Sequence, residues 1–205
     1  MERKLLNYLL EKKMEPRENE LQSNNKLKII LYIMSILARD EILKLIKQGK
    51  IKIKPFKKSQ VGAGSIDLHL GNAFRVFKKI HGTFHVKDDV DHKEITKSVK
   101  VKNGSYFLIM PGEMVHGVSK ETISLPDNVA GFIEGRSRFA RVGLLTHLSS
   151  GYIHPGTTNK TVLEIANLSP IPLAIYPGTR VCQIVLEEVK GKASYRGKFH
   201  KQTGP

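Results

Sequence analysis

Short apolar runs separated by proline-containing turns are the feature that most limits how this chain can fold. Turns are indicated at Pro111-Gly112, Pro126-Asp127, Pro155-Gly156 and Pro177-Gly178. Proline sets the φ angle that a turn needs and glycine accepts a positive φ, so such pairs reverse the chain. The runs between the turns are too short for helices, which favours strands. We expect strands at residues 51–53, 74–77, 107–110, 130–133, 162–165, 173–175 and 181–186.

Several short strands at this spacing predict a mainly β protein, either a barrel or a jelly roll. One short helix is expected before the strands, over residues 38–48. Ile42, Leu45 and Ile46 fall on one face of this helix, and Gly49 ends it.

The polar stretch 82–103 is expected to be a solvated loop. It carries Asp88, Asp89, Asp91 and His92, which would have to converge before they could hold a metal ion. A solvated loop is the more common outcome for such a stretch.

Composition limits the class of protein. The chain has 205 residues, enough to bury a core, and 40% of them are hydrophobic, as in ordinary globular proteins. Its formal net charge of +15 favours polyanionic partners, either nucleic acid or a nucleoside triphosphate, and does not choose between them. The longest apolar run, residues 29–38, is about half as long as a membrane span, so we expect a cytoplasmic protein.

A single cysteine, Cys182, excludes an internal disulfide and a cysteine-rich zinc site. It lies in an apolar run, where a small buried side chain is expected. Zinc-dependent nucleobase deaminases need a histidine, a glutamate and a pair of cysteines in a set that this chain lacks.

Residues 135–164 contain the side chains best suited to chemistry. Arg136 and Ser137 follow a glycine, and Arg141 comes about one helical turn later. Guanidinium groups offer paired donors to phosphate oxygens, and a hydroxyl or amide beside glycine can approach closely. Gly-Arg-Ser alone is a common sequence, so surface arginines in a loop are the alternative interpretation.

A carboxylate, Glu164, follows in the apolar run Thr161-Val-Leu-Glu-Ile-Ala. A charge among residues that belong in a sheet is unfavourable unless it is paired or has a chemical role. The alternative is a strand whose acidic residue faces water. The pattern alone leaves both interpretations open.

The same segment resembles the trimeric dCTP deaminase and dUTPase superfamily, and the order of its parts is most similar to the dCTP deaminase branch. The resemblance covers residues 34–205 and includes Ser65-Ile-Asp-Leu-His-Leu-Gly71 and the closing Gln202-Thr-Gly-Pro205. It implies a distorted β-barrel with a short N-terminal helix, assembled as a homotrimer with shared active sites. It also implies a mobile C-terminal lid, over about residues 188–205, that closes the site.

Residues 1–33 lie outside the resemblance. Their leucines and alternating charges suit a short amphipathic helix, followed by a polar link at 15–25 that we expect to be disordered. Two interpretations stay open, a non-native upstream start and a helix that makes contacts between subunits.

By this resemblance, Glu164 is the general acid and base of a zinc-independent deamination of dCTP to dUTP and ammonia. Ser137 helps to position the attacking water or its adduct. Arg141 is expected near Glu164, where it keeps the carboxylate ionised and stabilises the adduct. The backbone carbonyl of Ser150 matches the position that orients the water.

The resemblance also implies residues that hold the nucleotide. The amide of Gln183 contacts the nucleotide, although a structural glutamine in a strand is an equal alternative on residue type. Arg138 stands where a second serine is usual and adds a donor. The other candidates are Arg136, Ser137, His154, Tyr195, Lys198, Lys201 and Gln202. A disordered basic tail is the alternative interpretation for the last four. Mg²⁺ is expected to be held by the triphosphate, without protein ligands, and no zinc is expected.

Three residues depart from the family pattern. His154 stands where both branches usually carry an aspartate, which in dUTPases activates the water that attacks the α-phosphate. The substitution argues against ordinary dUTPase chemistry, although imidazole can act as a base near neutral pH. Thr157 replaces an aromatic residue that packs on the deoxyribose, and Asn159 replaces a glycine, so selection against a ribose 2′-hydroxyl is expected to be looser or achieved otherwise.

The leading prediction is therefore a homotrimeric, Mg²⁺-assisted dCTP deaminase. The first alternative is a dUTPase, or a bifunctional dCTP deaminase and dUTP diphosphatase. A non-catalytic nucleotide sensor or nucleic-acid binder comes last, because the sequence lacks interleaved aromatic platforms for bases.

Overall fold

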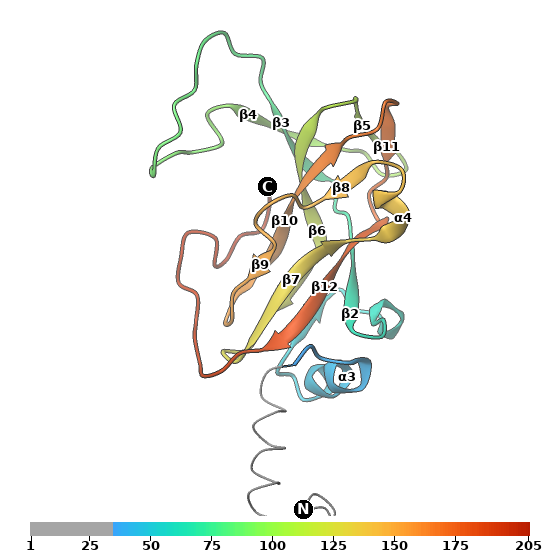
Figure 1. Ribbon diagram of the computed structural model, residues 1–205, viewed down its shortest axis with the longest axis vertical. Helices are drawn as coiled ribbons and strands as arrows, with labels where there is room; N and C mark the ends of the chain where they lie inside the picture. The colour runs from blue at the N-terminus through green and yellow to red at the C-terminus, as the bar shows by residue number, and fades with distance from the viewer. Residues whose placement is uncertain (1–34) are drawn as a thin grey trace, which may run out of the picture. The chain divides into compact units, whose positions relative to one another are not determined.

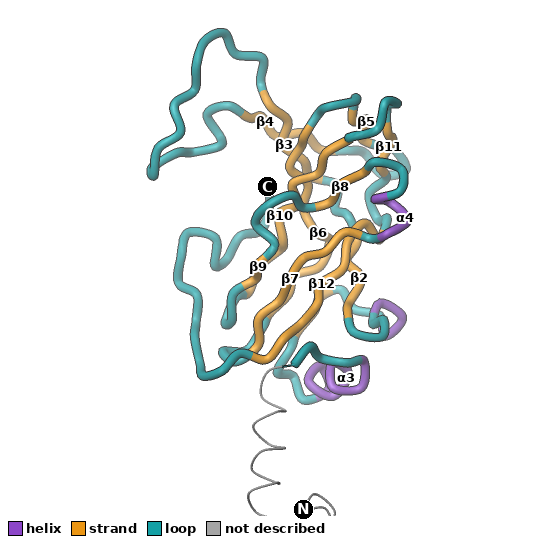
Figure 2. Tube along the Cα trace, viewed as in Figure 1, coloured by secondary structure: helices purple, strands orange, loops and turns teal. Residues whose placement is uncertain are grey.

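The computed structural model describes residues 35–205, of which Ile36–Pro205 form one compact unit. The predicted extension over residues 1–33 lies outside the described residues, and its two interpretations stay predictions. Among the helices of the described part, none is long and apolar enough to cross a membrane. Figure 1 labels the elements, and Figure 2 shows that strands and loops make up most of the described chain.

The predicted helix over residues 38–48 is confirmed as α3 (Arg39–Lys47). Ile42 and Leu45 are buried on one face of it, as their spacing predicts. The helix stops before Gly49, whose φ of 71° turns the chain toward the first strand.

The remaining elements follow in chain order. They are β1 (Lys52–Lys54), the 3-10 helix η1 (Lys58–Gln60), β2 (Ser65–His69), β3 (Ala73–Phe77), β4 (Thr96–Lys100), β5 (Phe107–Ile109), β6 (Met114–Ser124), β7 (Val129–Gly135), α4 (Ser137–Ala140), β8 (Leu144–Thr146), β9 (Tyr152–Ile153), β10 (Thr158–Asn167), β11 (Leu173–Ile175) and β12 (Arg180–Glu188).

The strands form two main antiparallel sheets. The larger has six strands in the order β4-β3-β6-β10-β8, with β1 also paired to β6, and the smaller has four in the order β2-β12-β7-β9. Strands β11 and β5 form a separate pair. The mainly β prediction is confirmed, but the strand order does not return to its start, so the expected barrel is open.

One buried apolar cluster joins the two sheets. It includes Phe74 and Leu163 from the larger sheet and Leu68 and Ile184 from the smaller one, all fully buried. Buried positions alternate along β2, because successive side chains of a strand point to opposite faces. Cys182 belongs to this cluster, and burial raises the pKa of its thiol to about 12. The cysteine is therefore a packing residue, as its apolar run predicts.

All seven predicted strands are present, within one to several residues at their ends, but five strands were not predicted. The longest of these is β6, which occupies the middle of the larger sheet. Its His116, Lys120 and Glu121 interrupt the apolar pattern, although Glu121 is only 1% exposed. The loop prediction for residues 82–103 is wrong over β4, an edge strand of mainly polar residues that pairs with β3.

The ladder between β6 and β10 contains an irregularity. Lys160 pairs with Thr122 whereas Val162 pairs with Val118, so β6 has the longer stretch between matched positions. Ser119 fills the break, because its hydroxyl accepts a hydrogen bond from the Thr161 N–H over 2.9 Å and donates one to the carbonyl oxygen of Glu121 over 2.8 Å. Glu121 follows Ser119 by two positions and lies on the same buried face of β6, as strand alternation requires.

Candidate active site

Glu164 lies on β10, and the loop between β8 and β9 holds its carboxylate. The Ser150 hydroxyl donates to Oε1 over 2.9 Å, and Ser149 donates to Oε2 from its N–H and its hydroxyl, each over 3.0 Å. Burial by itself would raise the pKa of Glu164, but these hydrogen bonds and nearby His147 outweigh it and hold the pKa below the ordinary value of 4.5. Glu164 is therefore an ionised carboxylate at neutral pH.

His147 joins this loop to the strand. Its N–H donates to the carbonyl oxygen of Glu164 over 2.9 Å. Its φ is 78°, and no other described residue besides glycine has a positive φ. Backbone conformations of this kind are unfavourable for a residue with a side chain and concentrate at functional sites. Sequence reasoning missed both His147 and Ser149, because their role depends on the shape of the loop.

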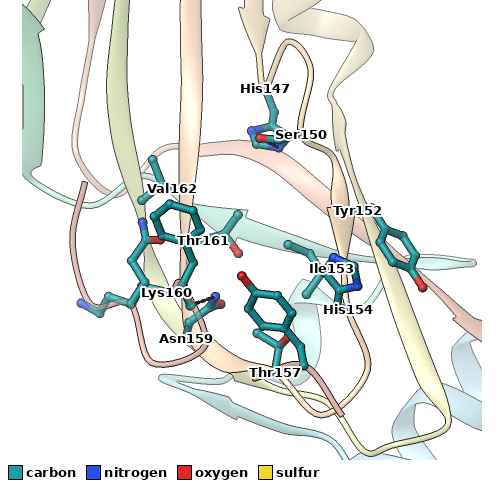
Figure 3. A pocket seen from close by; sticks show the side chains of 13 residues that line it. His147, Ser150, Tyr152, Ile153, His154, Thr157, Asn159, Lys160, Thr161 and Val162 are labelled. Atoms are coloured by element: carbon teal, nitrogen blue, oxygen red, sulfur yellow. Dashed lines mark hydrogen bonds between the residues drawn. The ribbon is translucent and has the colours of Figure 1, made fainter. Parts of the chain in front are cut away.

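A cavity of about 240 Å³ lies beside this loop (Figure 3). His147 and Ser150 lie at one end of it, and Thr157 and Asn159 lie at the other. Thr157 and Thr161 are 3% and 4% exposed. Within residues 35–205, four buried polar atoms that line the cavity have no hydrogen-bond partner: Thr157 Oγ1, Asn159 Oδ1, Thr161 Oγ1 and His147 Nδ1. Buried polar groups are normally paired, so these atoms are available to a polar ligand.

The predicted lid residues also reach this cavity, because the C-terminal segment packs on the turn between β9 and β10. Tyr195 N–H donates to the carbonyl oxygen of Pro155 over 3.0 Å, and Lys160 N–H donates to that of Gln202 over 2.9 Å. The ring of Tyr195 stacks on His154 at 4.9 Å between centroids and 8° between planes. Tyr195, Gln202 and His154 therefore share one cavity, whereas the mobility of the lid stays a prediction.

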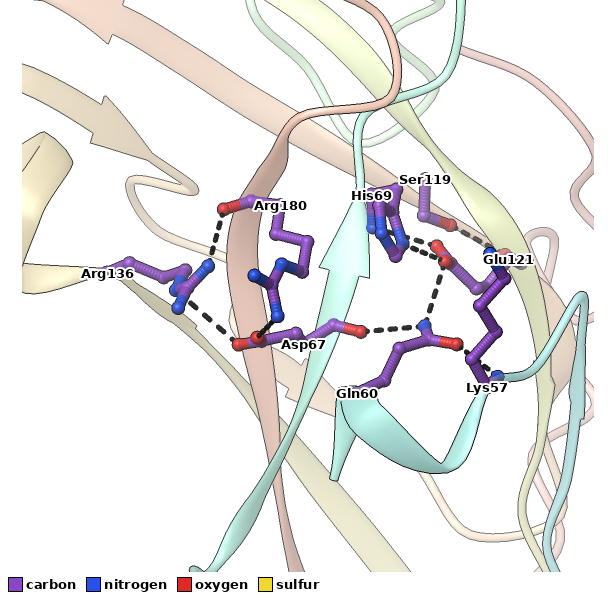
Figure 4. Close-up of polar contacts among 8 residues, drawn as sticks. All are labelled: Lys57, Gln60, Asp67, His69, Ser119, Glu121, Arg136 and Arg180. Carbon is purple, nitrogen blue, oxygen red and sulfur yellow. Dashed lines mark hydrogen bonds and ion pairs between the residues drawn. The ribbon is translucent and has the colours of Figure 1, made fainter. Parts of the chain in front are cut away.

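A second group of polar residues lies where β2, β7 and β12 meet (Figure 4). Asp67 forms ion pairs with Arg136, at 3.4 Å from Oδ1 to Nε, and with Arg180, at 3.1 Å from Oδ2 to Nη1. Next to it on the smaller sheet, Gln183 accepts a hydrogen bond from the Ser65 hydroxyl over 2.6 Å. Arg136 and Gln183 thus both lie beside Asp67, and their contacts with a nucleotide stay predictions. Asp67 and Arg180 were not predicted as site residues, although the motif Ser65-Ile-Asp67 contains the signal.

Beside this group, Glu121 forms a buried hydrogen-bonded network that is also drawn in Figure 4. Its carboxylate accepts bonds from Gln60 Nε2 over 3.0 Å and from the His69 N–H over 2.9 Å, and it pairs with the His69 ring. Gln60 also donates to the carbonyl oxygen of Asp67 over 3.0 Å. The network therefore supports β2 at the residue that holds the two arginines.

The other predicted residues stand apart from Glu164. Ser137 and Arg138 lie in α4, and Arg141 follows it. Within residues 35–205, no hydrogen bond or ion pair joins Glu164 to Ser137, Arg138 or Arg141, so one chain does not bring them together as expected. Lys198 Nζ lies over the ring of Phe199, 5.9 Å from its centroid. Lys201 is exposed. In that same part of the chain, no group of three or more metal-ligating side chains converges, the acids of residues 88–91 included.

Comparison with known proteins gives the family. A family model described as dCTP deaminase-like matches residues 36–189. The chain belongs to the dCTP deaminase-like family.

Two relatives from this family are named dCTP deaminase, dUMP-forming. The protein from Dictyoglomus thermophilum is 35% identical over 179 residues, which cover 83% of this chain and 92% of the relative. The protein from Methanobrevibacter smithii is 36% identical over 181 residues, which cover 84% and 93%.

The family fold is also visible in a solved structure. The crystal structure of 2′-deoxycytidine 5′-triphosphate deaminase from Agrobacterium tumefaciens matches with a TM-score of 0.60 at 21% identity, over 76% of this chain. The match spans about half (49%) of that protein's length. At this level of identity, the likeness shows the fold alone.

Proposed function

We propose that this dCTP deaminase-like chain deaminates dCTP by hydrolysis and that dUMP is its final product. The observation that carries the proposal is Glu164, an ionised carboxylate fixed by Ser149 and Ser150 next to a cavity with unpaired buried polar groups. The names of the relatives from D. thermophilum and M. smithii support both the substrate and the product. The product dUTP, expected from the sequence, is accordingly replaced by dUMP in this proposal.

In the deamination step, Glu164 removes a proton from a water molecule whose oxygen bonds to C4 of cytosine. Glu164 then delivers that proton to N3, which gives an adduct with hydroxyl and amino groups on C4. Loss of the hydroxyl proton restores the C4 carbonyl, and the amino group leaves with that proton as ammonia. Hydrogen bonds from Ser149 and Ser150 fix the direction of the carboxylate throughout.

Arg136 and Arg180 are the proposed triphosphate contacts. Asp67 holds both guanidinium groups before any ligand arrives, so little ordering is needed when the phosphates bind. Mg²⁺ would be held by the triphosphate and would neutralise part of its charge, because this cation keeps most of its waters and binds readily through substrate phosphates.

A homotrimer with shared sites would explain why Glu164 lies apart from Ser137 and Arg141 within one chain. Glu164 and the cavity lie on β10 and its neighbours, whereas Ser137 and Arg141 flank α4 without contacting them. In a cyclic trimer, α4 of one subunit can face β10 of the next, and every site is then completed in the same way.

The final product depends on a second hydrolysis, in which water attacks the α-phosphate of dUTP and releases diphosphate. His154 stands at the position where an aspartate was expected from the family pattern. Its ring lies between Tyr152, at 4.7 Å, and Tyr195, at 4.9 Å. This packing favours a second candidate function, a deaminase that stops at dUTP because His154 is a packing residue rather than a base.

A chromatographic assay on dCTP and dUTP, supplied separately with Mg²⁺, tests the proposal. Conversion of dCTP to dUMP, ammonia and diphosphate supports it, and His154→Ala should then abolish diphosphate release while ammonia release continues. Accumulation of dUTP from dCTP supports the second candidate. Consumption of dUTP without any reaction of dCTP, or no reaction of either nucleotide, contradicts the deaminase assignment.

A further inference from the structure

A row of charged and titratable residues crosses three neighbouring strands of the larger sheet. His116 on β6 is the register partner of Glu164 on β10 and of Arg75 on β3. Residues directly opposite each other in an antiparallel pair project from the same face, with Cβ atoms about 5 Å apart. The imidazole of His116 is therefore the cross-strand neighbour of the Glu164 carboxylate, on the side away from Arg75.

His116 and Glu164 also line one cavity, of about 220 Å³. Its other walls come from His92, Val162, Phe199, Gln202 and Pro205. The His116 ring is fixed in this wall by edge contacts with Phe77 and His92, each at 5.7 Å between centroids. Planar and apolar walls with one carboxylate and one carboxamide suit a flat, polar heterocycle. A base bound there would lie next to both Glu164 and His116.

His116 is suited to accept a proton. Burial holds the pKa of His116 below its ordinary value, and the nearby His92 and Arg75 act in the same direction, whereas Glu164 opposes them. These are the titratable and charged groups that face His116 from the loop before β4, from β3 and from β10. The imidazole is consequently neutral near pH 7 and can accept a proton.

Glu164 is less suited than His116 to carry both protons that the deamination moves. Its low pKa makes it a weak base and a poor store for a proton between two steps. Deamination moves two protons in succession, one to N3 and one to the departing amino group. A second carrier next to Glu164 would remove that limitation.

We propose that His116 is a catalytic residue that carries the second proton of the deamination. The proposal rests on the proposed function. After Glu164 has delivered the first proton to N3, His116 accepts the proton of the C4 hydroxyl and passes it to the amino group. The C4–N bond then breaks with its electron pair on nitrogen, the C4 carbonyl forms, ammonia leaves, and His116 is neutral again.

The test is ammonia release from dCTP by His116→Gln, compared with the wild type and with His85→Gln, whose side chain is exposed in the loop before β4. We expect kcat to fall about a hundredfold with KM within about twofold, and added imidazole to restore part of the rate. We expect His85→Gln to match the wild type. The wild-type rate should fall as pH drops through the His116 pKa, and the His116→Gln variant should lack that limb. A kcat near the wild-type value, a change in KM alone, or a loss that imidazole does not restore would overturn the proposal.

A second measurement does not depend on turnover or on the stability of the His116 variant. The ring-proton NMR titration of His116 is compared in the wild type and in Glu164→Gln. Loss of the neighbouring negative charge should lower the His116 pKa. An unchanged titration would show that the pair is not coupled and would overturn the proposal.

The two hypotheses fail in different ways. If the wild type releases no ammonia from dCTP, the proposed function fails and the role of His116 fails with it. If the wild type releases ammonia and His116→Gln does so at the same rate, only the role of His116 fails.

Discussion

The hydroxyl of Ser150 donates a 2.9 Å hydrogen bond to Oε1 of Glu164. Together with the two bonds from Ser149 to Oε2, it occupies both oxygens of the carboxylate and favours the charged form. Many catalytic carboxylates have a raised pKa because burial dominates. Here burial is outweighed by the three hydrogen bonds together with nearby His147, so the pKa is lowered and the carboxylate is ionised at neutral pH but is a weak base.

Replacement of Glu164 by Gln should abolish turnover while the nucleotide still binds. The amide keeps the shape of the side chain but cannot carry the proton, and loss of such a group reduces rates by about 10²- to 10⁴-fold. Ammonia release measures the first effect, and calorimetric titration with dCTP measures the second. Glu94→Gln, at an exposed position of the loop before β4, is the matched control. An active Glu164→Gln variant would refute the role of this residue.

Replacement of Ser150 by Ala should raise the pKa of Glu164, because one of the bonds that favour the carboxylate is lost. In the wild type the folded-state pKa is below 4.5, so these bonds contribute stability above that pH and lose their contribution as pH falls through the folded-state pKa. The stability difference between wild type and Ser150→Ala should therefore be present at pH 7 and shrink toward pH 3. Carboxyl ¹³C NMR reports the pKa directly. A pKa that does not move would mean that Ser150 does not bond Glu164 in solution.

Subunit mixing should reveal whether sites are shared. Glu164→Gln and Arg141→Ala subunits are each expected to form inactive trimers. If each site takes Glu164 from one subunit and Arg141 from its neighbour, random mixed trimers should regain roughly a quarter of the wild-type rate. The subunits are unfolded together, refolded and assayed for ammonia release. No recovery in verified mixed trimers would place both residues in the same subunit's site.

Replacement of Glu121 by Ala should destabilise the protein strongly. The change leaves the Gln60 and His69 donors without hydrogen-bond partners inside the protein. Removing one partner of a buried network of this kind lowers the free energy of unfolding by about 3 kcal/mol. For a chain of this size, Tm should fall by roughly 10 °C. Glu134→Ala, at an exposed position of β7, is the control and should melt like the wild type. Equal melting of both variants would show that the network contributes nothing.

The parts of the fold predicted from sequence are those in which local pattern and tertiary environment agree. The apolar runs 130–133 and 181–186 became β7 and β12, and the helix over 38–48 became α3. Strand β6 was missed because Lys120 and Glu121 are residue types usually found at the surface. Glu121 can be buried because Gln60 and His69, which are distant in sequence, form hydrogen bonds with its carboxylate. Strand β4 was missed because an edge strand needs little apolar surface.

The residues of the candidate site also fall into those that the sequence predicts and those that only the structure reveals. Glu164, Arg136 and Gln183 were predicted from the family resemblance, because residue type and spacing alone left their roles open. The described chain places Arg136 and Gln183 around Asp67. Ser149 and His147 were missed because a loop conformation with a positive φ leaves no clear mark in sequence. Arg141 was predicted to lie near Glu164, but no hydrogen bond or ion pair joins the two within residues 35–205. A contact between Arg141 and the Glu164 of a neighbouring subunit stays a proposal.

The break in the β6–β10 ladder has a consequence for how this protein can change its length. On one side of Ser119 the alignment sets His116 against Glu164, and on the other side it sets Thr122 against Lys160. From Val118 to Thr122 the chain advances four positions on β6 while β10 advances two, from Val162 to Lys160, so a deletion of two residues would let the strands run regularly and keep both alignments. That deletion would remove part of the segment from Ser119 to Glu121, and with it the buried carboxylate that Gln60 and His69 contact. A shorter β6 should therefore still pair with β10 beside Glu164 but lose the network that supports β2.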